Sequence, residues 1–117
     1  MPHDLRKLLF DMQNAAMGIE MFVSGKSETD FRSDLMLRLA VERQFEIIGE
    51  ALGRLVKLDP STAQRISEYQ KIISFRNVLI HGYDSVNDAI TWRIIQDKLP
   101  VLQREPDELV RTLPPQP

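Results

Sequence analysis

The sequence predicts an all-α protein, a bundle of about five helices in a single domain. Apolar residues recur every three or four positions through most of the chain, the spacing that gives a helix one buried face. No stretch shows the alternation of apolar and polar residues that a half-buried strand requires. The chain has 117 residues, of which 43% are hydrophobic, and this suits one domain with a modest core. We expect the domain to span residues 1–113, followed by a flexible proline-rich tail at residues 114–117.

The first two predicted helices are long. Asp4 is the expected N-cap of the first, and the apolar spacing continues from there until Gly25. Residues 27–30, Ser-Glu-Thr-Asp, resemble a capping box that opens the second helix. We expect that helix to run from about Phe31 to Leu58, because no proline lies between them.

A short helix and then the helix with the most informative motif are expected next. Asp59 followed by Pro60 is typical of a helix start, and the short helix should reach about Tyr69. The motif helix follows almost at once and should end at Gly82, because glycine commonly closes a helix in a left-handed conformation.

The last helix is expected to begin near Asp88, after a turn. Pro100 should kink or interrupt it, because proline removes a backbone donor and clashes with the preceding turn. Pro106 and the prolines of the tail are expected to end regular structure.

Composition limits the possible functions. The 15 basic and 17 acidic residues give a net charge of -2, so an RNA substrate would need a local basic patch rather than an overall field. There is no cysteine, which excludes disulfides and thiolate metal sites. No apolar run is long enough to span a membrane and the start lacks the features of a signal peptide, so we expect a cytoplasmic protein without a membrane partner.

No metal and no cofactor are expected. Bundles that hold two metal ions use a Glu-x-x-His pattern, which this sequence lacks. His81 is the only histidine away from the chain start, and His3 is expected to be a surface residue.

Arg76 falls within the apolar arc of the motif helix and should therefore point inward. An inward guanidinium needs an acidic partner, which we expect to be Glu42 or Glu46 of the second helix. One interpretation is a purely structural ion pair. The other is an arginine that stabilises charge developing on a phosphodiester, and a glutamate that orients the arginine would make the two compatible.

Two more polar side chains lie close to Arg76 along the motif helix, and Tyr83 lies just beyond the helix end. Asn77 and His81 are four residues apart and share one edge of the helix. An imidazole in the last helical turn can be a structural group favoured by the helix dipole, or a general acid and base for attack of a ribose 2′-hydroxyl on its own phosphate. Asn77 is either a polar edge residue or a hydrogen-bond partner of the imidazole or of a phosphate. Tyr83 is either a half-buried ring or a residue with an exposed hydroxyl.

The run from Arg76 to Tyr83, Arg-Asn-Val-Leu-Ile-His-Gly-Tyr, resembles the R-x4-H-x-Y signature of the HepT-like toxins in the HEPN superfamily of helical ribonucleases. Residues 42–51, Glu-Arg-Gln-Phe-Glu-Ile-Ile-Gly-Glu-Ala, are similar to the second-helix segment of that family. The expected helix order also fits, over residues 4–113. The resemblance implies an up-and-down helical bundle that forms a homodimer, with the two motifs facing a shared cleft.

The resemblance also implies roles for the motif residues. Arg76 and His81 match the catalytic pair of a metal-independent endoribonuclease, and Asn77 matches the polar residue usual after the arginine. Tyr83 matches the tyrosine that the antitoxin of this family, a minimal nucleotidyltransferase, modifies with AMP from ATP to silence the nuclease. Glu42 and Glu46 would be the supporting acids.

The sequence thus predicts an RNA-cleaving toxin of a type VII-like toxin–antitoxin system. The alternative is a non-catalytic partner subunit of a nucleotidyltransferase that binds nucleotide or RNA through the same fold. A third possibility is a structural bundle in which Arg76 is only an internal ion-pair residue.

Overall fold

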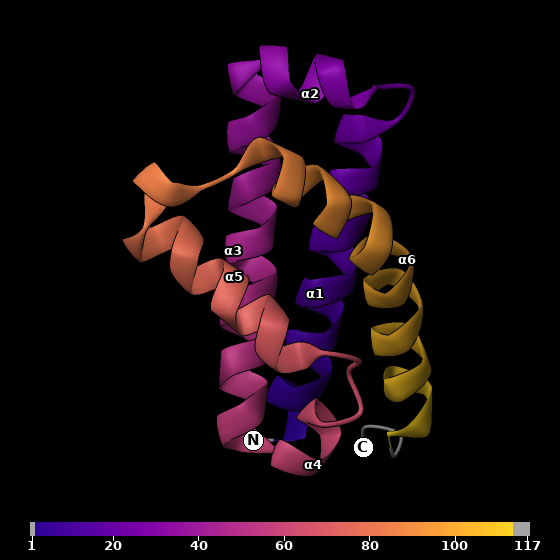
Figure 1. Ribbon diagram of the computed structural model, residues 1–117. Coiled ribbons are helices and arrows are strands. Elements are labelled where there is room, and N and C mark those ends of the chain that lie inside the picture. The colour runs from indigo at the N-terminus through magenta and orange to yellow at the C-terminus, as the bar shows by residue number, and fades with distance from the viewer. Residues whose placement is uncertain (1, 114–117) are drawn as a thin grey trace.

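The computed structural model describes the backbone of residues 2–113 and the side chains of residues 5–113 (Figure 1). Within that range the chain is all-α, as predicted, and contains no strand. The elements are α1 (Pro2–Val23), α2 (Glu28–Ser33), α3 (Leu35–Leu58), α4 (Pro60–Ala63), α5 (Tyr69–His81), the 3-10 helix η1 (Tyr83–Ser85) and α6 (Asp88–Thr112).

The bundle is organised around α1, which packs against α3 on one side and α6 on another. The core lies between these three long helices and is filled by aliphatic side chains and two phenylalanines: Leu9, Met12, Ile19, Phe31, Phe45, Ile48, Leu52, Ile95 and Leu102. Helix α5 crosses α3 obliquely, and its C-terminal end projects with η1 beyond the bundle, at the left of Figure 1. None of the described helices combines the length and apolar character needed to cross a membrane.

The expected second helix is divided in two at Asp34. The capping box at its start is present, because Ser27 and Asp30 each bond the backbone N–H of the other. Asp34 then takes an extended conformation, and its Oδ1 accepts a hydrogen bond from Leu37 N at 3.1 Å, which starts α3. The break lets α2 turn across the end of the bundle, where buried Phe31 contacts the Trp92 ring at a centroid distance of 5.5 Å.

The helix boundaries near α1 and α4 also differ from the prediction. Helix α1 begins at Pro2, before the expected cap at Asp4. Asp59 caps α4 as predicted, with Thr62 N donating to its carboxylate at 3.2 Å, but α4 ends at Ala63. Turns follow until α5 begins, and Glu68 precedes it in a left-handed conformation with φ 54°.

The end of α5 and the course of α6 correct two expectations. The helix ends before Gly82 as predicted, but φ there is -124°, so the glycine is not left-handed, and its N–H bonds Val78 O at 2.9 Å. Helix α6 contains both Pro100 and Pro106 and continues to Thr112, so the prediction that Pro106 ends regular structure was wrong. Pro106 is itself buried, and apolar contacts on both sides of it keep the helix against the core despite the lost backbone bonds. The predicted tail at residues 114–117 lies outside the described residues.

Candidate functional site

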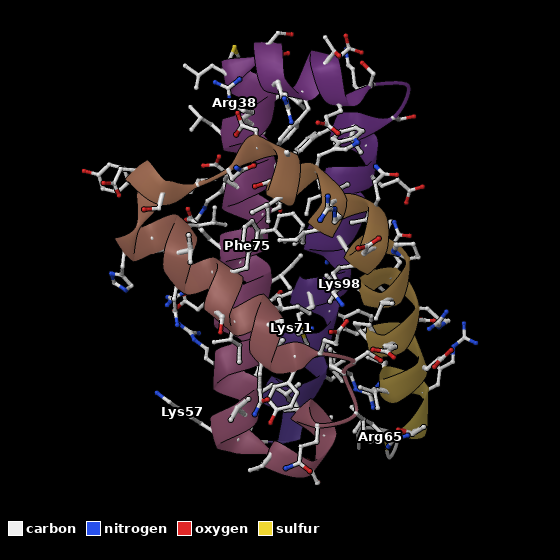
Figure 2. The ribbon with its side chains drawn as sticks, in the orientation of Figure 1. Arg38, Lys57, Arg65, Lys71, Phe75 and Lys98 are labelled. Atoms are coloured by element: carbon white, nitrogen blue, oxygen red, sulfur yellow. The ribbon has the colours of Figure 1, made fainter. Side chains whose placement is uncertain are left out.

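The motif residues Arg76, Asn77 and His81 lie on α5, which two buried aliphatic side chains, Ile72 and Leu79, hold against the bundle. Phe75 adds an edge-to-face contact with Phe45 of α3, at a centroid distance of 5.3 Å and an interplanar angle of 82° (Figure 2). Because the helix buries this face, Asn77 and His81 on the other side are exposed.

The close approach of α5 to α3 is centred on Arg76 and Gly49. A Cβ atom added to Gly49 would lie 2.2 Å from Cβ of Arg76 and 2.5 Å from its Cγ. Such distances are far below van der Waals contact, so only glycine fits opposite the arginine stem. The expected inward orientation of Arg76 therefore holds for its aliphatic stem, while 26% of its side chain stays exposed at the edge of the helix pair.

The guanidinium of Arg76 has two partners. Nη2 lies 3.7 Å from Oε2 of Glu50, and Nη1 donates a hydrogen bond of 3.1 Å to Oδ1 of Asn77. Nε is buried and has no hydrogen-bond partner among residues 5–113. Asn77 is therefore positioned by the arginine beside it, and one donor of the guanidinium remains unsatisfied.

The acidic partner of Arg76 is Glu50 rather than Glu42 or Glu46. Glu46 pairs with Arg43 of the same helix at 3.3 Å. The signal for Glu50 was present in the sequence, because Glu50 follows Gly49 directly and lies one turn beyond Glu46 on the same flank. What could not be inferred was how far along α3 the crossing lies.

Glu42 belongs to a different cluster, at the start of α6. Arg38 Nε lies 3.6 Å from Oδ2 of Asp88 there. Burial raises the pKa of Glu42, the carboxylate of Asp88 raises it further, and Arg38 opposes the change. Glu42 thus lies among α3 and α6 groups and is not paired with Arg76.

His81 is the last residue of α5, and its exposed imidazole makes no hydrogen bond or ion pair with the described side chains. Tyr83 follows in η1 with 76% of its surface exposed. Both side chains are carried by the part of the chain that projects from the bundle (Figure 1). Both are accessible to a large ligand or to another protein.

The arrangement places a guanidinium, an amide bonded to it and an exposed imidazole along the last two turns of α5. The planar fork of a guanidinium suits phosphate oxygens, and an imidazole is a common general acid and base. Within residues 5–113, no three His, Asp or Glu side chains come together as a metal-binding group.

Comparison with known proteins agrees with this chemistry. The family model described as "Ribonuclease HepT-like" matches residues 12–109. A candidate RNase of Caldanaerobacter subterraneus subsp. tengcongensis is 35% identical over 89 residues, covering 76% of this chain and 79% of the relative. A candidate RNase of Methanocaldococcus jannaschii is 28% identical over 102 residues, covering 87% of this chain and 93% of the relative. A candidate ribonuclease HepT of Thermococcus cleftensis is 29% identical over 104 residues, covering 86% of this chain and 91% of the relative. No solved structure matches the chain significantly.

Proposed function

Because the chain belongs to the HepT-like ribonuclease family, we propose that it is a metal-independent endoribonuclease with a site built from Arg76, Asn77 and His81. The observation that carries the proposal is the hydrogen bond from Arg76 to Asn77, one helical turn before the exposed imidazole of His81. Relatives named as candidate ribonucleases support the choice of RNA as substrate.

The proposed reaction is attack of a ribose 2′-hydroxyl on the adjacent phosphorus. His81 takes the proton of the 2′-hydroxyl as the bond from O2′ to phosphorus forms. The bond from phosphorus to O5′ breaks, and an imidazolium returns a proton to the leaving oxygen. Arg76 stabilises the extra negative charge on the phosphate oxygens of the transition state. The products are a 2′,3′-cyclic phosphate and a 5′-hydroxyl.

A homodimer fits this chemistry better than a single chain. Each chain supplies one imidazole at the motif, whereas the reaction needs a base and an acid on opposite sides of the phosphorus. A partner chain that presents its own Arg76 and His81 to the same phosphate would supply the second group and double the local positive charge. The projecting end of α5 is accessible for such a pairing.

We further propose that the protein is a cytoplasmic toxin and that a partner nucleotidyltransferase silences it at Tyr83. The phenolic oxygen would attack the α-phosphorus of ATP, with pyrophosphate leaving and AMP remaining on the ring. The 76% exposure of Tyr83 supports access by an enzyme of that kind. The added phosphate would place bulk and negative charge two residues from His81, where RNA phosphate has to bind.

The test is RNA cleavage by unmodified protein in excess EDTA, with His81→Ala as the paired variant. His81 is exposed, so the variant should fold normally, which circular dichroism would verify. Cleavage by the parent alone is the expected result. Absence of cleavage by both proteins across several RNA classes would contradict the proposal and favour the non-catalytic partner subunit.

A further inference from the structure

A groove runs between α1 and α3, beside the motif but not part of it. Its wider part has a volume of about 630 Å³ and is lined by Lys7, Leu8, Asp11, Arg54, Lys57 and Leu58. A narrower part of about 160 Å³ shares Leu8, Asp11 and Arg54 with it and extends along α3 to Arg43, Ile47 and Glu50. We call the two parts together the α1–α3 groove.

The α1–α3 groove has the opposite charge to the protein as a whole. Four basic and two acidic side chains line it, a net charge of +2, whereas the chain has a formal net charge of -2. The lining basic residues are Lys7, Arg43, Arg54 and Lys57. This is the kind of local basic surface that an acidic protein needs in order to hold a polyanion.

The basic groups of the groove are available to a ligand. Lys57 forms no ion pair with any side chain of residues 5–113, and Figure 2 shows it extending outward from α3. Among the side chains of residues 5–113, Lys7 pairs only with Asp11, at 2.8 Å, and the lysine side chain is 69% exposed. Exposed pairs of this kind contribute little to stability, so a phosphate can replace the carboxylate at small cost.

Glu50 links the groove to the motif. Its Oε1 lies 3.0 Å from Nη2 of Arg54, which lines both parts of the groove, and its Oε2 lies 3.7 Å from Nη2 of Arg76. Lys57 follows Glu50 by two turns of helix, about 10 Å along the axis of α3. A chain that has one phosphate at Arg76 can therefore place its next phosphates over Arg54 and Lys57.

We propose that the α1–α3 groove binds the phosphate backbone of the single-stranded RNA that flanks the cleaved bond. This assignment rests on the proposed ribonuclease function. The groove would hold flanking nucleotides through charge alone, independently of base sequence, while the motif acts on the scissile phosphate.

The test compares two double variants that remove the same charge. The groove variant is Lys7→Gln with Lys57→Gln, and the control is Arg104→Gln with Arg111→Gln, two exposed α6 residues that pair with acids at i+4 and i-4. Binding is measured by fluorescence anisotropy with a labelled single-stranded oligoribonucleotide made uncleavable by 2′-O-methyl groups. Cleavage is measured on an RNA oligonucleotide and on a dinucleotide, which has no flanking phosphate.

The groove variant is expected to bind about tenfold more weakly at low salt, with a salt dependence shallower by about 1.4 in the log–log slope, as for two lost phosphate contacts. It should cleave the oligonucleotide less efficiently than the parent does. Its rate on the dinucleotide should equal that of the parent. The control should match the parent in every assay. Equal binding by the groove variant and the control would overturn the assignment, as would an equal loss on both substrates.

The two proposals fail separately. A parent that binds the oligonucleotide through the groove but cleaves no RNA would contradict the ribonuclease proposal alone. If the parent cleaves RNA and the groove and control variants bind the oligonucleotide equally well, the groove assignment alone is contradicted.

Discussion

Gly49 of α3 and Arg76 of α5 approach so closely that no methyl group fits between them: a Cβ atom on the glycine would lie 2.2 Å from the arginine Cβ. This contact fixes where the arginine emerges from the helix pair. Oε2 of the adjacent Glu50 lies 3.7 Å from Nη2 of the guanidinium. One short segment of α3 therefore sets both the position and the direction of Arg76.

The Gly49→Ala substitution should therefore force α5 away from α3. The clash involves the Cβ and Cγ atoms of Arg76, which cannot swing aside as a side-chain tip could. We expect a loss of about 1–3 kcal/mol in the free energy of unfolding, measured by urea denaturation. Gly53→Ala is the matched control, because a Cβ there meets nothing within 4 Å, and it should stabilise the helix by about 0.5–1 kcal/mol. Equal stability of the two variants would contradict the steric account.

Glu50→Gln should reduce cleavage without reducing RNA affinity. The substitution keeps the shape of the side chain but removes the charge that directs Arg76, so we expect kcat to fall on the order of ten- to a hundredfold while KM does not rise. Glu46→Gln, on the same helix but paired with Arg43, should leave kcat unchanged. Steady-state kinetics on a defined RNA would measure both. A rise in KM at constant kcat would show that Glu50 does not act through the arginine.

Glu42→Gln should stabilise the protein at neutral pH but not in acid. Burial raises the pKa of Glu42 above its ordinary value of 4.5, so the folded state binds the proton more tightly than the unfolded state does. The protonated carboxyl therefore supports folding below that ordinary value, and the support is lost as pH rises through the raised pKa. Thermal melts of parent and variant should coincide at low pH and separate towards pH 7. A parent more stable than the variant at pH 7 would contradict this reading.

At the break between α2 and α3, the Asp34 side chain caps the start of α3. Asp34→Ala removes the acceptor for Leu37 N and should cost about 1 kcal/mol in the free energy of unfolding, measured in urea. Asp34→Asn keeps an acceptor oxygen and should retain most of the stability. A loss as large in the asparagine variant as in the alanine variant would show that the capping bond is not the cause.

The sequence was sufficient for the helical class, for the core-facing stripes and for the helix starts at Ser27 and Asp59. Each of these depends on spacing or on a local cap, which a single segment contains. It was not sufficient at Asp34, where the helix breaks, or at Pro106, where the helix continues, because packing between helices decides both outcomes. Phe31 against Trp92 favours the break, and burial of Pro106 keeps α6 intact.

For the candidate site, too, the sequence was sufficient for one part and not for another. The motif on α5 could be recognised from residue types and spacing alone. The partner of Arg76 could not, because the level at which α5 crosses α3 decides between Glu46 and Glu50, and that level is set by the fit of Arg76 onto Gly49. The α1–α3 groove had no signal of its own, since its basic residues are separated along the chain and brought together by the α1–α3 packing.

The most direct test of the central claim is the chemistry of the RNA ends. Unmodified protein in excess EDTA would be given an RNA oligonucleotide and the same oligonucleotide with a single 2′-deoxyribose at the cleaved position. We predict a 2′,3′-cyclic phosphate and a 5′-hydroxyl from the RNA, and no cleavage at the deoxy position, because the attacking 2′-hydroxyl is missing there. Cleavage of the deoxy position, or products that carry a 3′-hydroxyl, would contradict the proposed mechanism at His81.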